Sequence, residues 1–249
     1  VWRPENYSTG KYYGPTTLRN ALIRSLNTVT VRLAQDVGMP LIGEYSKRFG
    51  VYDELPNYLS YALGAGETTV MRMVTAYSMF ANGGKRVKPT LIERIQDRYG
   101  HTIFKHDQRE CRDCDGGDVW KNQPEPSLVD RREQVLDSMT AYQITSMMEG
   151  VVQRGTGTYA KRLNRPVAGK TGTSNDYKDA WFIGFTPGMV AGVWVGNDNF
   201  ATTARVTGGS MPADIWARFM PVALRDTPIR PLEMPRESDY DEGVPDPTI

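Results

Sequence analysis

The sequence contains only two cysteines and two histidines, and its charges nearly cancel, with 30 Lys and Arg against 29 Asp and Glu. So few cysteines exclude a disulfide-rich scaffold, and the balanced charge gives no electrostatic reason to expect nucleic acid as a partner. Long apolar runs are also missing. The most apolar stretch, residues 188–196, is far shorter than the roughly 20 residues that a membrane helix needs. We therefore expect a globular chain of 249 residues, long enough to bury a sizeable core.

The beginning of the chain also lacks expected features. It starts at Val1 with no initiator methionine and no charged-then-apolar signal segment. We expect the sequence to be a piece of a longer protein, with any membrane anchor upstream.

Apolar residues recur at helical spacing in several segments, and alternate with polar residues in others. The helical segments are residues 16–38, with a break near Asn27, and residues 40–50, 68–82, 138–154 and 213–226. A hairpin is predicted over residues 91–104, and three strands over residues 167–174, 180–185 and 189–195. Because the turns between these strands are too short for helical crossovers, the strands should pair antiparallel. The fold class is therefore α+β, an antiparallel sheet flanked by helices.

The domain organisation follows from two shifts in composition. Residues 106–126 carry both cysteines, several Gly and Pro and many charges, which is typical of a surface loop insertion. Residues 227–249 hold five prolines and six acidic residues, which predicts a Pro-rich acidic tail. We expect residues 1–226 to form one domain.

One motif, Lys170-Thr171-Gly172-Thr173, lies on a predicted strand just before a turn. On an edge strand it would present an ammonium, two hydroxyls and a gap at the glycine, so that a peptide could lie along the backbone while its carboxylate meets the hydroxyls. The alternative is an exposed turn with a solvated lysine.

Two segments partly match nucleotide-binding motifs, but each lacks a feature that its motif requires. A P-loop ending at Lys170 would need glycine where Asn164 stands. Residues 155–160 match the spacing of a dinucleotide-binding loop, but a helix rather than a strand precedes them.

His101 and His106 lie far in sequence from every other candidate, which disfavours a Ser-His-Asp triad. A nucleophilic serine would have to pass its proton to a lysine or a carboxylate.

Ser25 and Asn27 stand at the predicted helix break, about 145 residues before Lys170. A serine and an asparagine there are also typical of a pair of helix caps. Together with Lys170-Thr171-Gly172-Thr173, however, they match two of the three motifs of penicillin-recognising serine enzymes, S-x-x-K, S-x-N and K-T-G. Supporting segments are LRNALIRSLNTVTVRLAQDVG, ALGAGE, AYSMFANGG, GVVQRGTGTYA and AGKTGTSNDYKDAWFIGFTP. On these motifs the chain resembles the C-terminal part of the transpeptidase domain of class A penicillin-binding proteins.

The resemblance implies a penicillin-binding, β-lactamase-like transpeptidase fold, here N-terminally truncated. The third motif, S-x-x-K, carries the family's nucleophile on a helix. Its only match is Ser8-Thr9-Gly10-Lys11, where Gly10 and the following Gly14-Pro15 favour a loop. We therefore expect the nucleophile and its lysine to lie outside this sequence.

The resemblance also implies roles for the matched residues. Ser25 would relay a proton to the departing amine, with Lys170 beside it, and Asn27 would orient the substrate's carbonyl and the missing lysine. Thr171 and Thr173 would bind the terminal carboxylate of the substrate. Gly172 would leave room for the acyl group, and the Thr173 N–H would form half of an oxyanion hole.

The implied activity is that of a peptidoglycan D,D-transpeptidase, a cofactor-free enzyme that joins D-Ala-D-Ala stem peptides through a serine acyl-enzyme. Its partners would be stem peptides, β-lactam antibiotics and an upstream glycosyltransferase domain, at the periplasmic face of the bacterial inner membrane. The membrane would be reached only through an upstream anchor, and no nucleic acid is expected. Two alternatives stay open, a D,D-carboxypeptidase or β-lactamase-like hydrolase, and a non-catalytic binding or scaffolding module of the same fold.

The two cysteines, Cys111 and Cys114, form a separate feature. With His101 and His106 they make a set loosely compatible with zinc, although the spacing does not match a zinc finger. A disulfide fits better, because the family works in an oxidising compartment. A pair of free thiols is the remaining alternative.

We also expect the chain alone to expose apolar surface and to be poorly soluble, since the helix with the nucleophile is missing.

Overall fold

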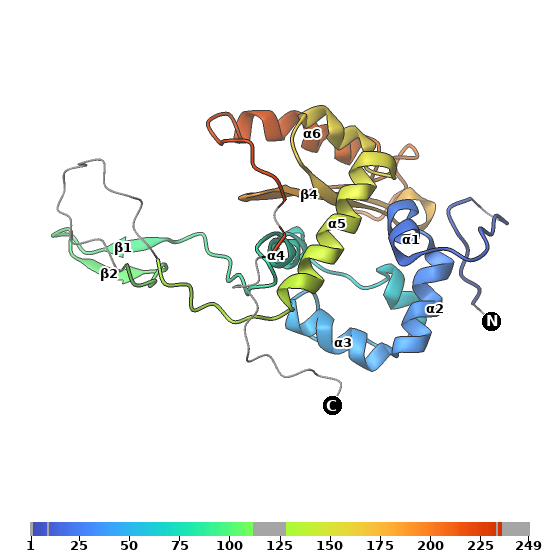
Figure 1. The fold of residues 1–249 in the computed structure, drawn as a ribbon, viewed down its shortest axis with the longest axis horizontal. Helices are drawn as coiled ribbons and strands as arrows, with labels where there is room; N and C mark the ends of the chain where they lie inside the picture. Colours follow the sequence, from blue (N-terminus) through green and yellow to red (C-terminus); the bar gives the residue numbers. More distant parts are fainter. Residues whose placement is uncertain (1, 9, 112–127, 233, 236–249) are drawn as a thin grey trace.

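The computed structural model describes residues 2–8, 10–111, 128–232 and 234–235. Figure 1 shows the arrangement of the elements. The α-helices are α1 (Leu18–Arg24), α2 (Asn27–Val37), α3 (Met39–Arg48), α4 (Val70–Ala81), α5 (Ser138–Arg154) and α6 (Met211–Ala223). The strands are β1 (Arg94–Gln96), β2 (Thr102–Lys105), β3 (Ala168–Thr173), β4 (Asp179–Thr186) and β5 (Met189–Gly196). Short 3-10 helices, η1 (Leu59–Leu63), η2 (Thr158–Leu163) and η3 (Asn175–Tyr177), complete the described elements.

The central sheet has the strand order β3-β4-β5, and both pairings are antiparallel. The α+β fold class predicted from the sequence is therefore confirmed, as is the antiparallel pairing that the short turns indicate. Lys170 lies opposite Ile183, and Thr173 opposite Ala180. Since β3 stands at one end of this order, one of its edges has no neighbouring strand in the part of the chain that the structure describes.

The two faces of the sheet are covered by different helices (Figure 1). On one face α6 and η2 bury Trp216, whose ring lies 5.4 Å from that of Phe182 on β4. On the other face α4 and α5 pack against residues such as Phe185, and Met148 of α5 belongs to the same cluster. Alternate residues of β4 thus face opposite helical layers, as strand geometry requires. The core holds β4 in place, and β3 is positioned through it.

The helices match the predicted segments with small shifts at their ends. α5 has the predicted bounds, whereas residues 40–50 form α3 from Met39 to Arg48, and α6 ends at Ala223 instead of residue 226. Pro221 lies inside α6, and it is tolerated near the end of the helix because few backbone bonds follow it. The 3-10 helix η1 was not predicted, since its five residues are too short to give a periodic signal.

The hairpin β1–β2 forms as predicted and projects away from the rest of the molecule (Figure 1). It leads into the predicted insertion, of which residues 112–127 lie outside the described part, as do residues 236–249 of the predicted tail. Among the described helices, none is both long and apolar enough to cross a lipid bilayer.

Candidate active site

The structure brings Ser25 and Lys170 together across 145 residues of sequence. The Lys170 ammonium donates to Ser25 Oγ at 2.7 Å and to the backbone carbonyl of Thr171 at 2.9 Å. Because Ser25 Oγ accepts this bond, the hydroxyl proton of Ser25 remains available for another acceptor. Ser25 can therefore donate its proton to another group while Lys170 remains hydrogen-bonded to the Ser25 oxygen.

Ser25 follows α1 in a left-handed backbone conformation, with φ 55° and ψ 51°. Its N–H donates to the carbonyl of Leu22, and the N–H of Leu26 donates to that of Ala21, a helix-ending pattern in which glycine usually takes this position. A side chain here costs about 1 kcal/mol or more. Strain of this kind collects at functional sites, so a serine in a position suited to glycine favours a chemical role for its hydroxyl.

The position of α1 is fixed by close contact with α5. Gly150 on α5 faces Ile23 of α1, and a Cβ at Gly150 would lie only 2.6 Å from Ile23 Cδ1. A Cβ on Gly155, just after α5, would likewise meet the carbonyl oxygen of Ile23. The two glycines let α1 approach closely enough for Ser25 to reach Lys170.

Lys170 is a half-buried residue of β3, and its ammonium reaches Ser25 at the end of α1. Burial lowers the pKa of Lys170 to about 8, from an ordinary value of 10.5, because desolvation disfavours the charged form. The neutral amine of Lys170 is therefore a weaker base, and its ammonium a better proton donor, than those of an exposed lysine. At neutral pH the protonated form still predominates.

The backbone of β3 presents polar groups at its free edge. The N–H of Ser174 donates to the carbonyl of Asp179 at 2.9 Å, so this N–H points toward β4. Since successive N–H groups of a strand point in opposite directions, the N–H of Thr173 points to the free edge. That is the position the resemblance requires for an oxyanion donor.

The hydroxyls of Thr171 and Thr173 are each held by a neighbouring loop. Thr171 Oγ1 lies 2.6 Å from Thr156 Oγ1, and Thr173 Oγ1 accepts a bond from the N–H of Gly208 at 3.0 Å. Being two residues apart on a strand, the two threonines share one face of β3. Gly172 lies between them against Trp181.

Asn27 bonds to the N-terminal segment, and its expected role toward the substrate and the missing lysine stays a prediction. It is the first residue of α2, and its side-chain amide donates to the backbone carbonyl of Glu5 at 2.9 Å. The start of α2 is capped by Asn6, whose side-chain oxygen accepts the N–H and the hydroxyl of Thr28. The N-terminal segment thus substitutes for a local cap, since Leu26 has no capping side chain.

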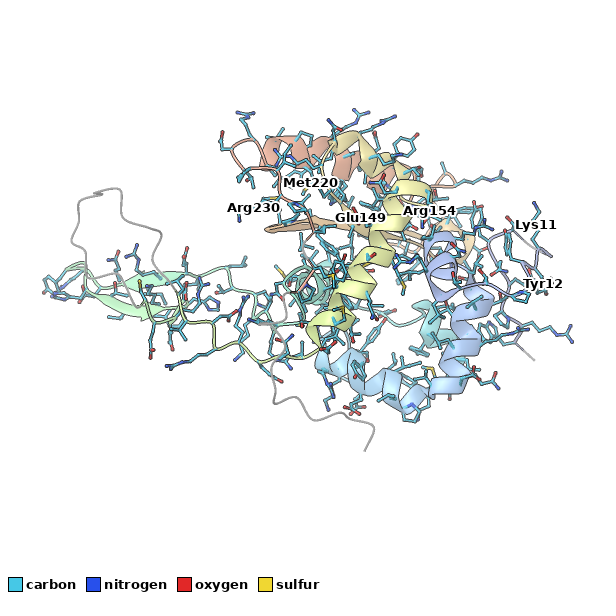
Figure 2. All side chains as sticks on the ribbon, in the orientation of Figure 1. Lys11, Tyr12, Glu149, Arg154, Met220 and Arg230 are labelled. Atoms are coloured by element: carbon cyan, nitrogen blue, oxygen red, sulfur yellow. The ribbon has the colours of Figure 1, made fainter. Side chains whose placement is uncertain are left out.

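Ser8 and Lys11 lie in a turn, as predicted, and not on a helix. The N–H of Lys11 donates to the carbonyl of Ser8, and Gly10 between them has φ +75°. Lys11 and Tyr12 project from the N-terminal segment at the rim of the molecule (Figure 2). This arrangement does not put Ser8 and Lys11 on one helical face, which the S-x-x-K motif requires.

The residues considered for zinc are not assembled into a metal site in the described part of the chain. His101 pairs with Asp97 at 3.0 Å, on the projecting hairpin. Cys111 is disulfide-bonded, in keeping with the preferred interpretation, while Cys114 lies outside the described residues.

Sequence reasoning missed three residues of this site: Asn6, Thr156 and Gly208. Thr156 belongs to the segment Gly155-Thr156-Gly157, which matches a nucleotide-binding pattern and also lies in one of the segments that carry the resemblance, but neither pattern gives Thr156 a role. A threonine between two glycines directly after a helix is a usable signal, because such a loop can approach another backbone closely. Asn6 and Gly208 gave no local signal, since each acts on a residue that is distant in sequence.

Comparison with known proteins covers nearly the whole chain. Residues 1–220 match the family model of the penicillin-binding protein transpeptidase domain. Penicillin-binding protein 1A of Rickettsia bellii is 45% identical over 239 residues, which are 94% of this chain and 30% of that protein. The corresponding protein of Pseudomonas aeruginosa is 37% identical, over 94% of this chain and 32% of its own length. The chain thus spans about a third of the length of these relatives.

Solved structures give the same result. The crystal structure of penicillin-binding protein 1A from Haemophilus influenzae matches with a TM-score of 0.76 and 28% identity, over 94% of this chain and 38% of that chain. PonA1 of Mycobacterium tuberculosis, solved with penicillin V, has a TM-score of 0.75 at 24% identity, over 98% of this chain and 65% of that chain, and shows the likeness of fold. The resemblance found in the sequence is confirmed, and the chain belongs to the family of penicillin-binding protein transpeptidase domains.

Proposed function

We propose that this chain supplies the stem-peptide site and the proton relay of a peptidoglycan D,D-transpeptidase, and that the serine nucleophile lies upstream of Val1 in the parent protein. The observation that carries the proposal is the bond from the Lys170 ammonium to Ser25 Oγ at 2.7 Å, beside the free edge of β3. A serine–lysine pair is the proton-transfer device that such a site needs when no histidine is near.

In the first half-reaction the serine oxygen bonds to the carbonyl carbon of the penultimate D-alanine, and the bond to the nitrogen of the terminal D-alanine breaks. The proton of the serine ends on that departing amine. Ser25 gives the proton of its own hydroxyl to the amine and regains one from the Lys170 ammonium, and the proton lost by the nucleophile replaces the one that Lys170 gives up. The Thr173 N–H stabilises the oxyanion that forms in between.

In the second half-reaction an amine of a neighbouring stem peptide attacks the acyl-enzyme. A new amide bond forms, the bond to the serine oxygen breaks, and the serine regains a proton from the attacking amine. β-Lactams acylate the same serine, because their ring amide and carboxylate resemble the end of the stem peptide. The parent protein would work on the periplasmic side of the inner membrane, joined to a glycosyltransferase domain and held by an upstream anchor.

The test uses the purified parent enzyme with a stem peptide ending in D-Ala-D-Ala and a peptide amine acceptor, with products followed by mass spectrometry. Ser25→Ala should lower the rates of D-alanine release and of cross-linking about 100-fold or more, as loss of a general acid does. Ser8→Ala is the matched control and should leave both rates unchanged.

Other outcomes would separate the alternatives. D-Alanine release without any cross-linked product would favour a carboxypeptidase. Peptide binding by the unmodified parent without turnover or β-lactam acylation would favour the non-catalytic module. Full activity of Ser25→Ala would remove the proton relay from the proposal.

A further inference from the structure

Two loops outside the strand touch the hydroxyls of the candidate carboxylate site. Thr156 follows α5, and its Oγ1 lies 2.6 Å from Thr171 Oγ1. Gly208 precedes α6, and its N–H donates to Thr173 Oγ1 at 3.0 Å. Each threonine of β3 therefore has one polar partner supplied by a different segment of the chain.

A hydroxyl has one proton, and what its oxygen accepts decides where that proton goes. The oxygen of Thr173 accepts from a backbone N–H, which cannot take a proton in return. Its own proton is therefore free to bind an anion. In the contact between Thr156 and Thr171, either hydroxyl can be the donor. A carboxylate that binds here can only accept hydrogen bonds. Its binding therefore favours the arrangement in which Thr156 donates to Thr171 and Thr171 donates to the carboxylate.

We infer that Thr156 is a positioning residue, which fixes the Thr171 hydroxyl as a donor to the substrate carboxylate, while Gly208 does the same for Thr173. This inference rests on the proposed function. A chain of hydroxyls that ends on a charged group is mutually polarised, and bonds to charged acceptors are the stronger kind. The two loops thereby make the site selective for a carboxylate over a neutral group of the same shape.

The packing of the two loops supports a fixed arrangement. A Cβ on Gly208 would meet the carbonyl oxygen of Trp181, and would lie 2.5 Å from the carbonyl oxygen of Gly172. A Cβ on Gly209 would meet the carbonyl oxygen of Thr156. The loop before α6 therefore lies directly against both β3 and the loop of Thr156, and only glycine fits at these contacts.

The experiment measures acylation of the full-length parent by benzylpenicillin and by its methyl ester, which lacks the negative charge. Thr156→Val, nearly the same shape without the hydroxyl, should lower the rate constant for benzylpenicillin about 10-fold, the scale of one hydrogen bond to a charged group. The rate constant for the ester should stay within about 2-fold, so the selectivity for the carboxylate falls. Thr156→Ser should restore it.

Two controls show whether Thr156 acts through Thr171. Thr158→Val alters a hydroxyl two residues further on, at the start of η2, that has no hydrogen bond among the described residues, and it should behave like the wild type. In a Thr171→Val background, adding Thr156→Val should cause no further loss, since residues that act as a unit are not additive. Purified variants should share the wild-type unfolding temperature within a few degrees.

The inference is overturned if Thr156→Val slows both probes equally, or slows neither, or if its effect persists fully in the Thr171→Val background. A failure of the proposed function looks different, because the unmodified parent would then not be acylated by benzylpenicillin at all.

Discussion

At the scale of single residues, Ser25 combines two properties that conflict. Its backbone is left-handed, which suits glycine, but its hydroxyl is bonded to Lys170. Ser25→Gly and Ser25→Ala both remove the hydroxyl, and only alanine retains the strained side chain. We predict that the glycine variant is more stable than the alanine variant by about 1 kcal/mol, whereas both lose acylation to the same extent. Thermal unfolding and labelling with a fluorescent penicillin measure the two effects. Equal stability would show that the left-handed backbone carries no strain.

Lys170 gives a prediction about pH. Because burial lowers its pKa to about 8, its ammonium loses the proton as the pH rises through about 8. If the bond to Ser25 needs the ammonium, the rate of acylation falls above that pH. Lys170→Arg keeps the charge at all accessible pH values, so it should lower the rate but abolish the fall near pH 8. A fall that persists in the arginine variant would assign it to another group.

At the scale of elements, the contact between α1 and α5 positions Ser25. Gly150→Ala places a methyl group against Ile23, which lies only 2.6 Å from the new Cβ position. Overpacking of this kind costs about 1–3 kcal/mol, partly offset by the better helix propensity of alanine. We expect a lower unfolding temperature together with slower acylation, because α1 moves away from Lys170. Gly43→Ala, inside α3, where the new Cβ would meet nothing nearer than 3.7 Å, is the control for the loss of a helical glycine. Unchanged acylation in Gly150→Ala would show that α1 adjusts without moving Ser25.

The helices and strands could be predicted from the sequence better than the contacts of the candidate site. α5 follows from its apolar periodicity, and the antiparallel strands follow from alternation and short turns. The Ser25–Lys170 pair was reached only through the family motifs, because no local pattern joins residues 145 positions apart. Contacts such as Thr156 with Thr171 depend on how an α5 loop meets β3, which periodicity does not encode.

At the scale of the whole molecule, α6 exposes an apolar stripe on the side away from the sheet. Met211, Ile215, Phe219 and Val222 are between 42% and 63% exposed and follow helical spacing. A continuous stripe of this kind favours association. We predict that the isolated 249-residue chain self-associates, and that the double substitution Ile215→Glu and Phe219→Glu shifts it toward monomer. Light scattering during size-exclusion chromatography measures this. A monodisperse monomer before substitution would contradict the prediction.

The central claim is that this chain carries a transpeptidase site whose nucleophile lies upstream. Intact-mass spectrometry after incubation with penicillin tests it most directly, on the parent protein and on this chain in parallel. The account predicts one adduct on the parent, mapped by peptide digestion to a serine before Val1, and none on the 249-residue chain. An adduct on Ser8 or Ser25 of this chain, or no adduct on either protein, would contradict it.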